Sequence, residues 1–219
     1  MTEWPIDTRE KRCPACDQGP YRSLGQHWAR SADCSPPTLD DRRDEFVRGL
    51  LLGDASLEGR STPLLAITSM REQHARWIHD ELGWLSRGVE QMEGGAYRVR
   101  TVVHPRFGRY LTWSGGDGVP TTGWELTPRA ARPWYACDGG FSFTSAGATG
   151  QVTFPAATDA RQRALERLLG RAGFRALRWD RRVALPRSVT QRWLDWLGEP
   201  TPGSEHKWAT SKDEYEPLR

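Results

Sequence analysis

The sequence contains an internal repeat in which two apolar segments each end at an aspartate. Residues 49–57 read GLLLGDASL and residues 126–140 read LTPRAARPWYACDGG, and Asp138 stands 84 positions after Asp54 (138 − 54). The apolar spacing before each aspartate predicts a helix. A carboxylate at a helix C-terminus is destabilised by a few tenths to about 1 kcal/mol, and a bound cation is the simplest compensation. The repeat predicts two similar halves.

The predicted elements after each aspartate follow the same order: two strands, a helix and two more strands. In the first half, strands are expected at 55–61, 63–70, 97–103 and 109–113, with a helix at 71–83. In the second half, strands are expected at 141–144, 150–154, 174–181 and 182–185, with helices at 159–173 and 188–197. Thr38 and Thr127 are the expected N-caps of the two aspartate-ending helices.

Gly49 and Gly53 lie four residues apart, on one face of the first predicted helix. Glycine is the poorest helix former after proline, so this spacing favours close approach of another backbone along that face. The 84-residue offset aligns Pro133 with Gly49 and Cys137 with Gly53. Cys137 is therefore interpreted as a small packing residue rather than a nucleophile.

The N-terminal segment carries the spacing of a zinc site. Cys13 and Cys16 form a CxxC pair, and His27 and Cys34 follow at helical-turn distances. Three thiolates and an imidazole can close a tetrahedral Zn²⁺ site, and Ser23 is the expected N-cap of the helix that carries the histidine. So small a module needs the metal for its stability. The alternative is free cysteines with an exposed histidine.

The net charge is small, but nearly all of the basic residues are arginines. The net charge is +3, and of the 31 basic residues only three are lysines. Arginine suits phosphate and guanine, which permits nucleic-acid binding, but a codon-composition bias explains the same usage. No apolar run approaches the ~20 residues of a membrane span, and the first residues lack a signal-peptide core. We expect a cytoplasmic protein without membrane contact.

These motifs resemble those of the LAGLIDADG homing endonucleases of the single-chain, two-motif type. GLLLGDASL is similar to the first signature, LTPRAARPWYACDGG to the second, and HKW at 206–208 to the C-terminal segment of that group. The resemblance covers about residues 40–208. It implies an α+β fold of two pseudo-symmetric αββαββ half-domains, whose saddle-shaped antiparallel sheets lie over the DNA major groove. The expected domains are a zinc-finger module (1–36), two half-domains (37–125 and 126–208) and a polar tail (209–219).

The resemblance also implies a function: site-specific hydrolysis of double-stranded DNA, linked to intron or intein mobility. Asp54 and Asp138 would hold catalytic Mg²⁺, and Lys207 would support charge at the cleavage site. The two motif helices would pack together at Gly49, Gly53, Pro133 and Cys137. On the sheets, the candidate DNA-binding residues are Arg98, Arg100, Arg175 and Arg178. Because one chain carries both motifs, a monomer is expected.

Three features depart from the family pattern. Pro133 lies within a predicted helix, where proline costs about 3 kcal/mol or kinks it. Ala55 stands where glycine is usual, and residues 113–120 contain no counterpart of Lys207. The alternative is therefore a catalytically weakened nucleic-acid-binding protein on the same scaffold, either an RNA splicing maturase or a DNA-binding regulator. A third hypothesis is a zinc-finger interaction module attached to an unrelated α/β domain.

Overall fold

The computed structural model describes residues 12–59, 63–114, 119, 123–143 and 150–209. The chain divides into two compact units. Unit 1 comprises Met1–Asp44 and Ala55–Thr112, and unit 2 comprises Glu45–Asp54 and Trp113–Arg219. Helix α2 (Asp41–Leu52) begins in unit 1, and its remainder, with Asp54, belongs to unit 2.

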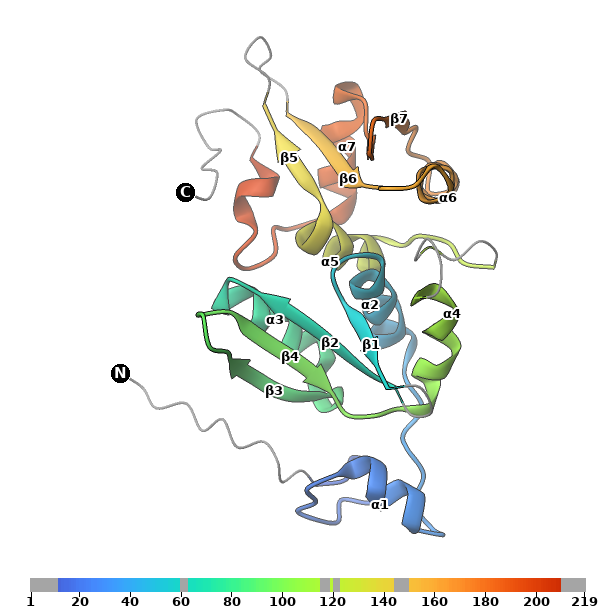
Figure 1. The fold of residues 1–219 in the computed structure, drawn as a ribbon, viewed down its shortest axis with the longest axis vertical. Coiled ribbons are helices and arrows are strands. Elements are labelled where there is room, and N and C mark those ends of the chain that lie inside the picture. Colours follow the sequence, from blue (N-terminus) through green and yellow to red (C-terminus); the bar gives the residue numbers. More distant parts are fainter. Residues whose placement is uncertain (1–11, 60–62, 115–118, 120–122, 144–149, 210–219) are drawn as a thin grey trace. The chain divides into compact units, whose positions relative to one another are not determined.

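Unit 1 is built around a four-stranded antiparallel sheet in the order β1-β2-β4-β3. Its elements along the chain are α1 (Leu24–Arg30), the start of α2, β1 (Ser56–Glu58), β2 (Leu64–Ser69), α3 (Glu72–Leu82), η1 (Gly83–Leu85), β3 (Ser86–Gln91), β4 (Tyr97–Thr101) and η2 (Pro105–Tyr110), followed by α4 (Leu111–Ser114). Helix α3 packs against β2, β3 and β4 (Figure 1). Its apolar residues Ala75, Ile78 and Leu82 are buried, as are Ile67 and Val99 on the strands.

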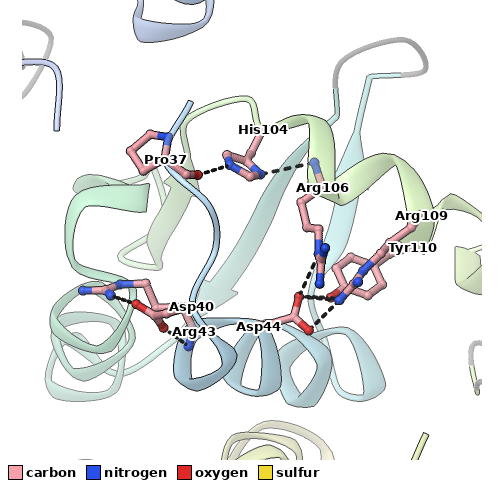
Figure 2. Close-up of polar contacts among 8 residues, drawn as sticks. All are labelled: Pro37, Asp40, Arg43, Asp44, His104, Arg106, Arg109 and Tyr110. Atoms are coloured by element: carbon pink, nitrogen blue, oxygen red, sulfur yellow. Dashed lines mark hydrogen bonds and ion pairs between the residues drawn. The ribbon is translucent and has the colours of Figure 1, made fainter. Parts of the chain in front are cut away.

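The start of α2 is held by two aspartates (Figure 2). Asp40 accepts a hydrogen bond from the backbone N–H of Arg43 at 2.7 Å, so Asp40 caps the helix and the predicted cap at Thr38 is wrong. Asp44 is buried and accepts hydrogen bonds from the guanidinium of Arg109 and the hydroxyl of Tyr110. A buried carboxylate is stable only when it is paired and hydrogen-bonded. Because the partners of Asp44 lie in η2, these bonds join α2 to η2.

Unit 2 repeats the same topology around a second four-stranded antiparallel sheet, in the order β5-β6-β8-β7. Its elements along the chain, after residues 45–54, are α5 (Pro128–Asp138), β5 (Gly140–Ser142), β6 (Gln151–Pro155), α6 (Asp159–Arg171), β7 (Leu177–Trp179), β8 (Arg182–Ala184), α7 (Arg187–Leu197) and η3 (Glu205–Trp208). In both sheets the strands lie in the order first, second, fourth, third. The predicted αββαββ repeat is therefore confirmed.

An aromatic cluster forms the core of unit 2 and fixes α5 in place. Trp134 of α5 stacks on Phe154 with ring centroids 4.0 Å apart, and Trp193 of α7 makes an edge contact with both rings. Tyr135 lies against Trp193 and Trp208. Thr127 caps α5 through the N–H of Ala130, as predicted. Helix α5 continues through Pro133. The buried side chains of Trp134 and Tyr135, which follow the proline, hold the helix against the core.

One strand prediction in the first half is wrong, and one strand was not predicted. Residues 109–113 form helical turns of η2 and α4 instead of a strand, because Arg109 and Tyr110 point to Asp44. The missing strand is β3, at an edge of the sheet, which the sequence pattern did not reveal. Predictions for residues 1–11, 60–61, 144 and 210–219 lie outside the described residues. Among the described helices, none combines the length and apolar character that a membrane crossing requires.

The Asp44 contacts yield a stability prediction. Breaking a buried ion pair by removing one partner costs about 3–5 kcal/mol. Because the Arg109 side chain is 35% exposed, we expect Asp44→Asn to lower the free energy of unfolding by a smaller amount, about 2–3 kcal/mol. Asp41→Asn, an exposed position on the same helix, is the control and should change it by less than about 0.5 kcal/mol. Urea unfolding measures both, and equal values would contradict the prediction.

Candidate functional site

Within unit 2, α2 and α5 approach each other through glycine. A side chain at Gly49 would overlap the carbonyl oxygen of Ala130, and its Cβ would lie 2.6 Å from Cγ of Pro133. At Gly53, a Cβ would lie 3.0 Å from Cβ of Cys137 and 3.6 Å from Cβ of Asp138. The backbones can lie this close because glycine has no Cβ. The predicted interface residues Gly49, Gly53, Pro133 and Cys137 all lie along this contact.

The contact brings the ends of the two helices, and the carboxylates there, together. Asp54 is exposed to solvent, whereas the side chain of Asp138 is only 14% exposed. Burial, and secondly the negative charge of Asp54, raise the pKa of Asp138 to about 6. Two carboxylates near helix C-termini repel each other, and a divalent cation between them would relieve this repulsion. Their hard oxygen ligands fit Mg²⁺.

Lys207 lies at the C-terminal end of α5. Its Nζ donates hydrogen bonds to the carbonyls of Ala136, at 2.7 Å, and Tyr135, at 3.3 Å. The hydroxyl of Tyr135 in turn donates to the carbonyl of Lys207 at 2.7 Å, which fixes η3 against the helix. The ammonium group lowers the pKa of Asp138 and opposes the effect of burial.

Arg161, on α6, is a site residue that the sequence analysis missed. Its Nη2 donates to the carbonyl of Leu52 at 3.0 Å and lies 3.7 Å from Oδ2 of Asp138. Leu52 precedes Ala136 by the 84-residue offset of the repeat (136 − 52), so the two motif helices carry a cation at equivalent carbonyls. The available signal was its position in the first turn of α6, after the Thr158 cap. Of the lysine-free segment 113–120, positions 115–118 and 120 lie outside the described residues.

In the first sheet, Arg98 and Arg100 of β4 share a face. Val99 between them is buried, so alternation places both arginines on the face opposite the buried one. Nε of Arg100 lies 3.4 Å from Glu58 of β1, and its Nη1 lies 4.0 Å from Glu90 of the adjacent strand β3. The two arginines therefore belong to a charged surface that faces away from the core.

In the second sheet, one of the two predicted arginines, Arg178, lies apart from the open face. Arg178 pairs with Asp159 at 2.9 Å and Glu166 at 3.2 Å, both on α6, so it lies on the helix-covered face. Arg175 is exposed and precedes β7. The open face instead presents Trp179, which is 64% exposed, with the guanidinium of Arg182 5.8 Å from its ring. The alternation about buried Val183 could have identified Arg182.

The N-terminal cysteines and histidine come together in unit 1. The ligand atoms of Cys13, Cys16, His27 and Cys34 all lie within 4.8 Å of one another. The Cys13 and Cys34 sulfurs are 3.5 Å apart, and Cys16 Sγ is 3.4 Å from His27 Nε2. Ser23 caps α1, as predicted. Four such donors fit a tetrahedral zinc ion.

The surroundings of the cluster favour a thiolate at Cys13. Burial raises the pKa of Cys13, but N–H groups of Ala15 and Cys16 and the indole of Trp28 outweigh it and bring the pKa to about 6. Trp28 Nε1 donates to Cys13 Sγ at 3.2 Å. Outside this cluster, burial strongly raises the pKa of Cys137, as expected for a packing residue.

Comparison with solved structures identifies the architecture. The homing endonuclease I-WcaI, solved bound to its DNA recognition sequence, matches with a TM-score of 0.67 over 85% of this chain and 92% of its own, at 12% identity. The chain has the fold of homing endonucleases. The meganuclease I-SmaMI, solved bound to uncleavable DNA, matches with a TM-score of 0.51 over 78% of this chain and 87% of its own, at 9% identity. No protein-family model matches the sequence, and no curated protein matches it.

The α2–α5 contact yields a prediction with a matched control. Gly49→Ala should lower the free energy of unfolding by about 1–3 kcal/mol, because the methyl group overlaps backbone that cannot move aside. Gly170→Ala, in α6, has no atom within 4 Å and should raise it by about 0.5–1 kcal/mol through helix propensity. Urea unfolding of both variants tests this, and a neutral Gly49→Ala would mean that the helices are not so close.

The cysteine cluster yields a metal-binding prediction. We expect one zinc per chain, measured by elemental analysis, and a cobalt-substituted protein with thiolate-to-metal absorption. Cys34→Ser should lose the metal and melt the N-terminal module. The control is Cys137→Ala, which lies outside the cluster and should retain the full amount. Equal metal content in all three proteins would contradict the assignment.

Proposed function

We propose that this chain is a site-specific double-stranded DNA endonuclease of the LAGLIDADG homing endonuclease type. The observation that carries the proposal is the pair of aspartates, Asp54 and Asp138, at the ends of two helices that touch through Gly49 and Gly53. The fold supports it, because I-WcaI and I-SmaMI, which share this fold, were both solved bound to DNA. The LAGLIDADG-like sequences at 49–57 and 126–140 coincide with the two helix ends.

Each polar residue of the site has a role in phosphodiester hydrolysis. Asp54 and Asp138 would hold divalent cations, with Mg²⁺ as the physiological metal. When bound, such cations neutralise the charge that develops on the phosphate and its leaving oxygen. Lys207 and Arg161 place positive charge beside the helix ends. Hydrogen bonds to carbonyl oxygens of α5 and α2, respectively, hold the two side chains there. Burial first, and the charge of Asp54 second, raise the pKa of Asp138 to about 6, although Arg161 and Lys207 both lower it.

The open faces of the sheets would provide binding and specificity. Arg98 and Arg100 on the first sheet, and Arg182 and Trp179 on the second, would contact the duplex. Arginine contacts to phosphate dominate affinity, whereas base-edge contacts determine sequence preference. Arg175 remains a candidate as an exposed residue, and Arg178 would join only by leaving its two acidic partners. The duplex would be bound by one chain, as a monomer.

The zinc cluster would have a structural role. Cys13, Cys16, His27 and Cys34 would hold one zinc ion and stabilise residues 12–36 as a zinc finger. The four protein ligands would form a closed donor set around the ion, which is the pattern of a structural rather than a catalytic site. The endonuclease would serve the mobility of an intron or intein in the cytoplasm.

A second candidate function is nucleic-acid binding without efficient cleavage, as in an RNA splicing maturase or a DNA-binding regulator. The observation that favours it is the pairing of Asp138 with Arg161, because a guanidinium 3.7 Å away competes with a metal for the same carboxylate. The two functions share binding and differ in metal-dependent hydrolysis.

Selection from a random duplex library separates the candidates. Wild type should enrich one duplex sequence in Ca²⁺ and cut both strands of it in Mg²⁺. Asp54→Asn and Asp138→Asn should bind that duplex within about threefold of wild type and cut it at least 100-fold more slowly, because each removes a metal ligand. The control, Asp41→Asn, should cut normally. Enrichment without Mg²⁺-dependent cleavage supports the DNA-binding regulator. No enrichment contradicts both the endonuclease and the DNA-binding regulator, and leaves only the RNA splicing maturase.

A further inference from the structure

Helix α1 of the N-terminal module presents three different faces. Leu24 and Trp28 are buried, and His27 points into the cysteine cluster. The third face carries Gln26 and Arg30, one helical turn apart, and Arg22 lies just before the Ser23 cap. Together with Tyr21, His27 and two serines, these residues line an open hollow of about 340 Å³. The volume is about ten times that of one water molecule, enough for a phosphate group with its sugar.

The hollow is suited to an anion. Its lining includes two arginines and no carboxylate. Neither guanidinium, of Arg22 or of Arg30, has a hydrogen bond or an ion pair to a residue that the structure describes. By contrast, Arg42 and Arg76, elsewhere in unit 1, pair with Glu81 and Glu72. Gln26 and the serine hydroxyls add neutral donors, from which phosphate oxygens can accept hydrogen bonds.

The hollow is held in a fixed shape. The ring of Tyr21 stacks on that of His27, with centroids 4.1 Å apart and an angle of 15° between the planes. The tyrosine hydroxyl lies 3.4 Å from the side-chain oxygen of Gln18. A zinc ion on His27 would fix this imidazole, and through it the tyrosine, before any ligand arrives. Preorganisation of this kind lowers the entropy cost of binding.

The module is attached to the rest of unit 1 at the end of β4. Gly25 of α1 lies directly on the side chain of Val103, where any Cβ would overlap it. Trp28 makes an edge contact with Trp84 at 6.3 Å, and His104 Nε2 is 3.0 Å from the carbonyl of Pro37. Val103 follows Arg100 by three residues, which is about 10 Å of extended chain. The module is therefore anchored to the end of the strand that carries Arg98 and Arg100.

We propose that Arg22, Gln26 and Arg30 form a second DNA-binding surface, which contacts the phosphate backbone of the duplex beyond the stretch covered by the first sheet. The zinc module thereby lengthens the bound site on one side only, since the described residues of unit 2 contain no second such cluster. The contacts are to phosphates, so they add affinity and position without reading the flanking sequence. This inference rests on the proposed DNA binding, but it does not require cleavage.

The test measures binding of catalytically inactive Asp138→Asn protein in Ca²⁺ to the selected duplex. The duplex is offered with long flanks on both sides, or with either flank removed. Arg22→Gln/Arg30→Gln is compared with Arg42→Gln/Arg76→Gln, which removes the same charge from paired arginines. Zinc content and urea unfolding verify that both double variants keep the module folded.

The parent protein should lose affinity when one particular flank is removed, and little when the other is removed. Arg22→Gln/Arg30→Gln should bind the long duplex only as tightly as the parent binds the duplex that lacks this flank. Removal of the flank should then not change the affinity of the variant. Its slope of log affinity against log salt should fall by about 1.8, or 0.9 for each lost phosphate contact. The control should keep the flank dependence and the slope of the parent.

Four outcomes overturn the inference. Equal slopes for the two double variants would show that the hollow does not contact phosphate. A loss of affinity that is the same with and without the flank would place the effect elsewhere than on flanking DNA. If the parent binds no duplex at all, the proposed function fails together with the inference, whereas duplex binding without flank dependence sinks the inference alone.

Discussion

The close approach of α2 and α5 is the interaction on which the candidate site depends. Gly49 lies against the backbone of Ala130 and the ring of Pro133, so nothing larger than a hydrogen fits there. This contact determines where the two helices end, and hence where Asp54 and Asp138 lie. The aromatic core around Trp134 and Trp193 holds α5 in that position from the other side. The proline in α5 is part of this contact, which gives a physical reason for its place within the helix.

Bringing two helix C-termini and two carboxylates together concentrates negative charge. The protein offsets part of it with Lys207 on the carbonyl of Ala136 and Arg161 on the carbonyl of Leu52. Burial first, and the charge of Asp54 second, still raise the pKa of Asp138 to about 6. A site with residual negative charge, hard oxygen ligands and solvent access at Asp54 is chemically suited to a divalent cation. The negative charges of Asp54 and Asp138 therefore oppose folding, whereas the proposed catalysis requires them.

Features encoded by local chemistry could be predicted from the sequence. Spacing along the chain predicts the order of the two halves and the convergence of Cys13 with its three partners. The capping side chains themselves identify the helix starts at Ser23 and Thr127. Features decided by distant contacts could not. Residues 109–113 look extended, but Asp44, some 65 positions earlier, draws Arg109 and Tyr110 into helical turns. Arg161 was missed for the same reason, because its partners lie on two other helices.

The most direct test of a metal site shared by Asp54 and Asp138 is anomalous X-ray diffraction from crystals of the protein with the selected duplex and Mn²⁺. The account predicts an anomalous peak about 2.0–2.3 Å from carboxylate oxygens of both aspartates, and its loss in Asp138→Asn crystals. A well-ordered complex whose Mn²⁺ peaks touch neither aspartate, or only one of them, would contradict it.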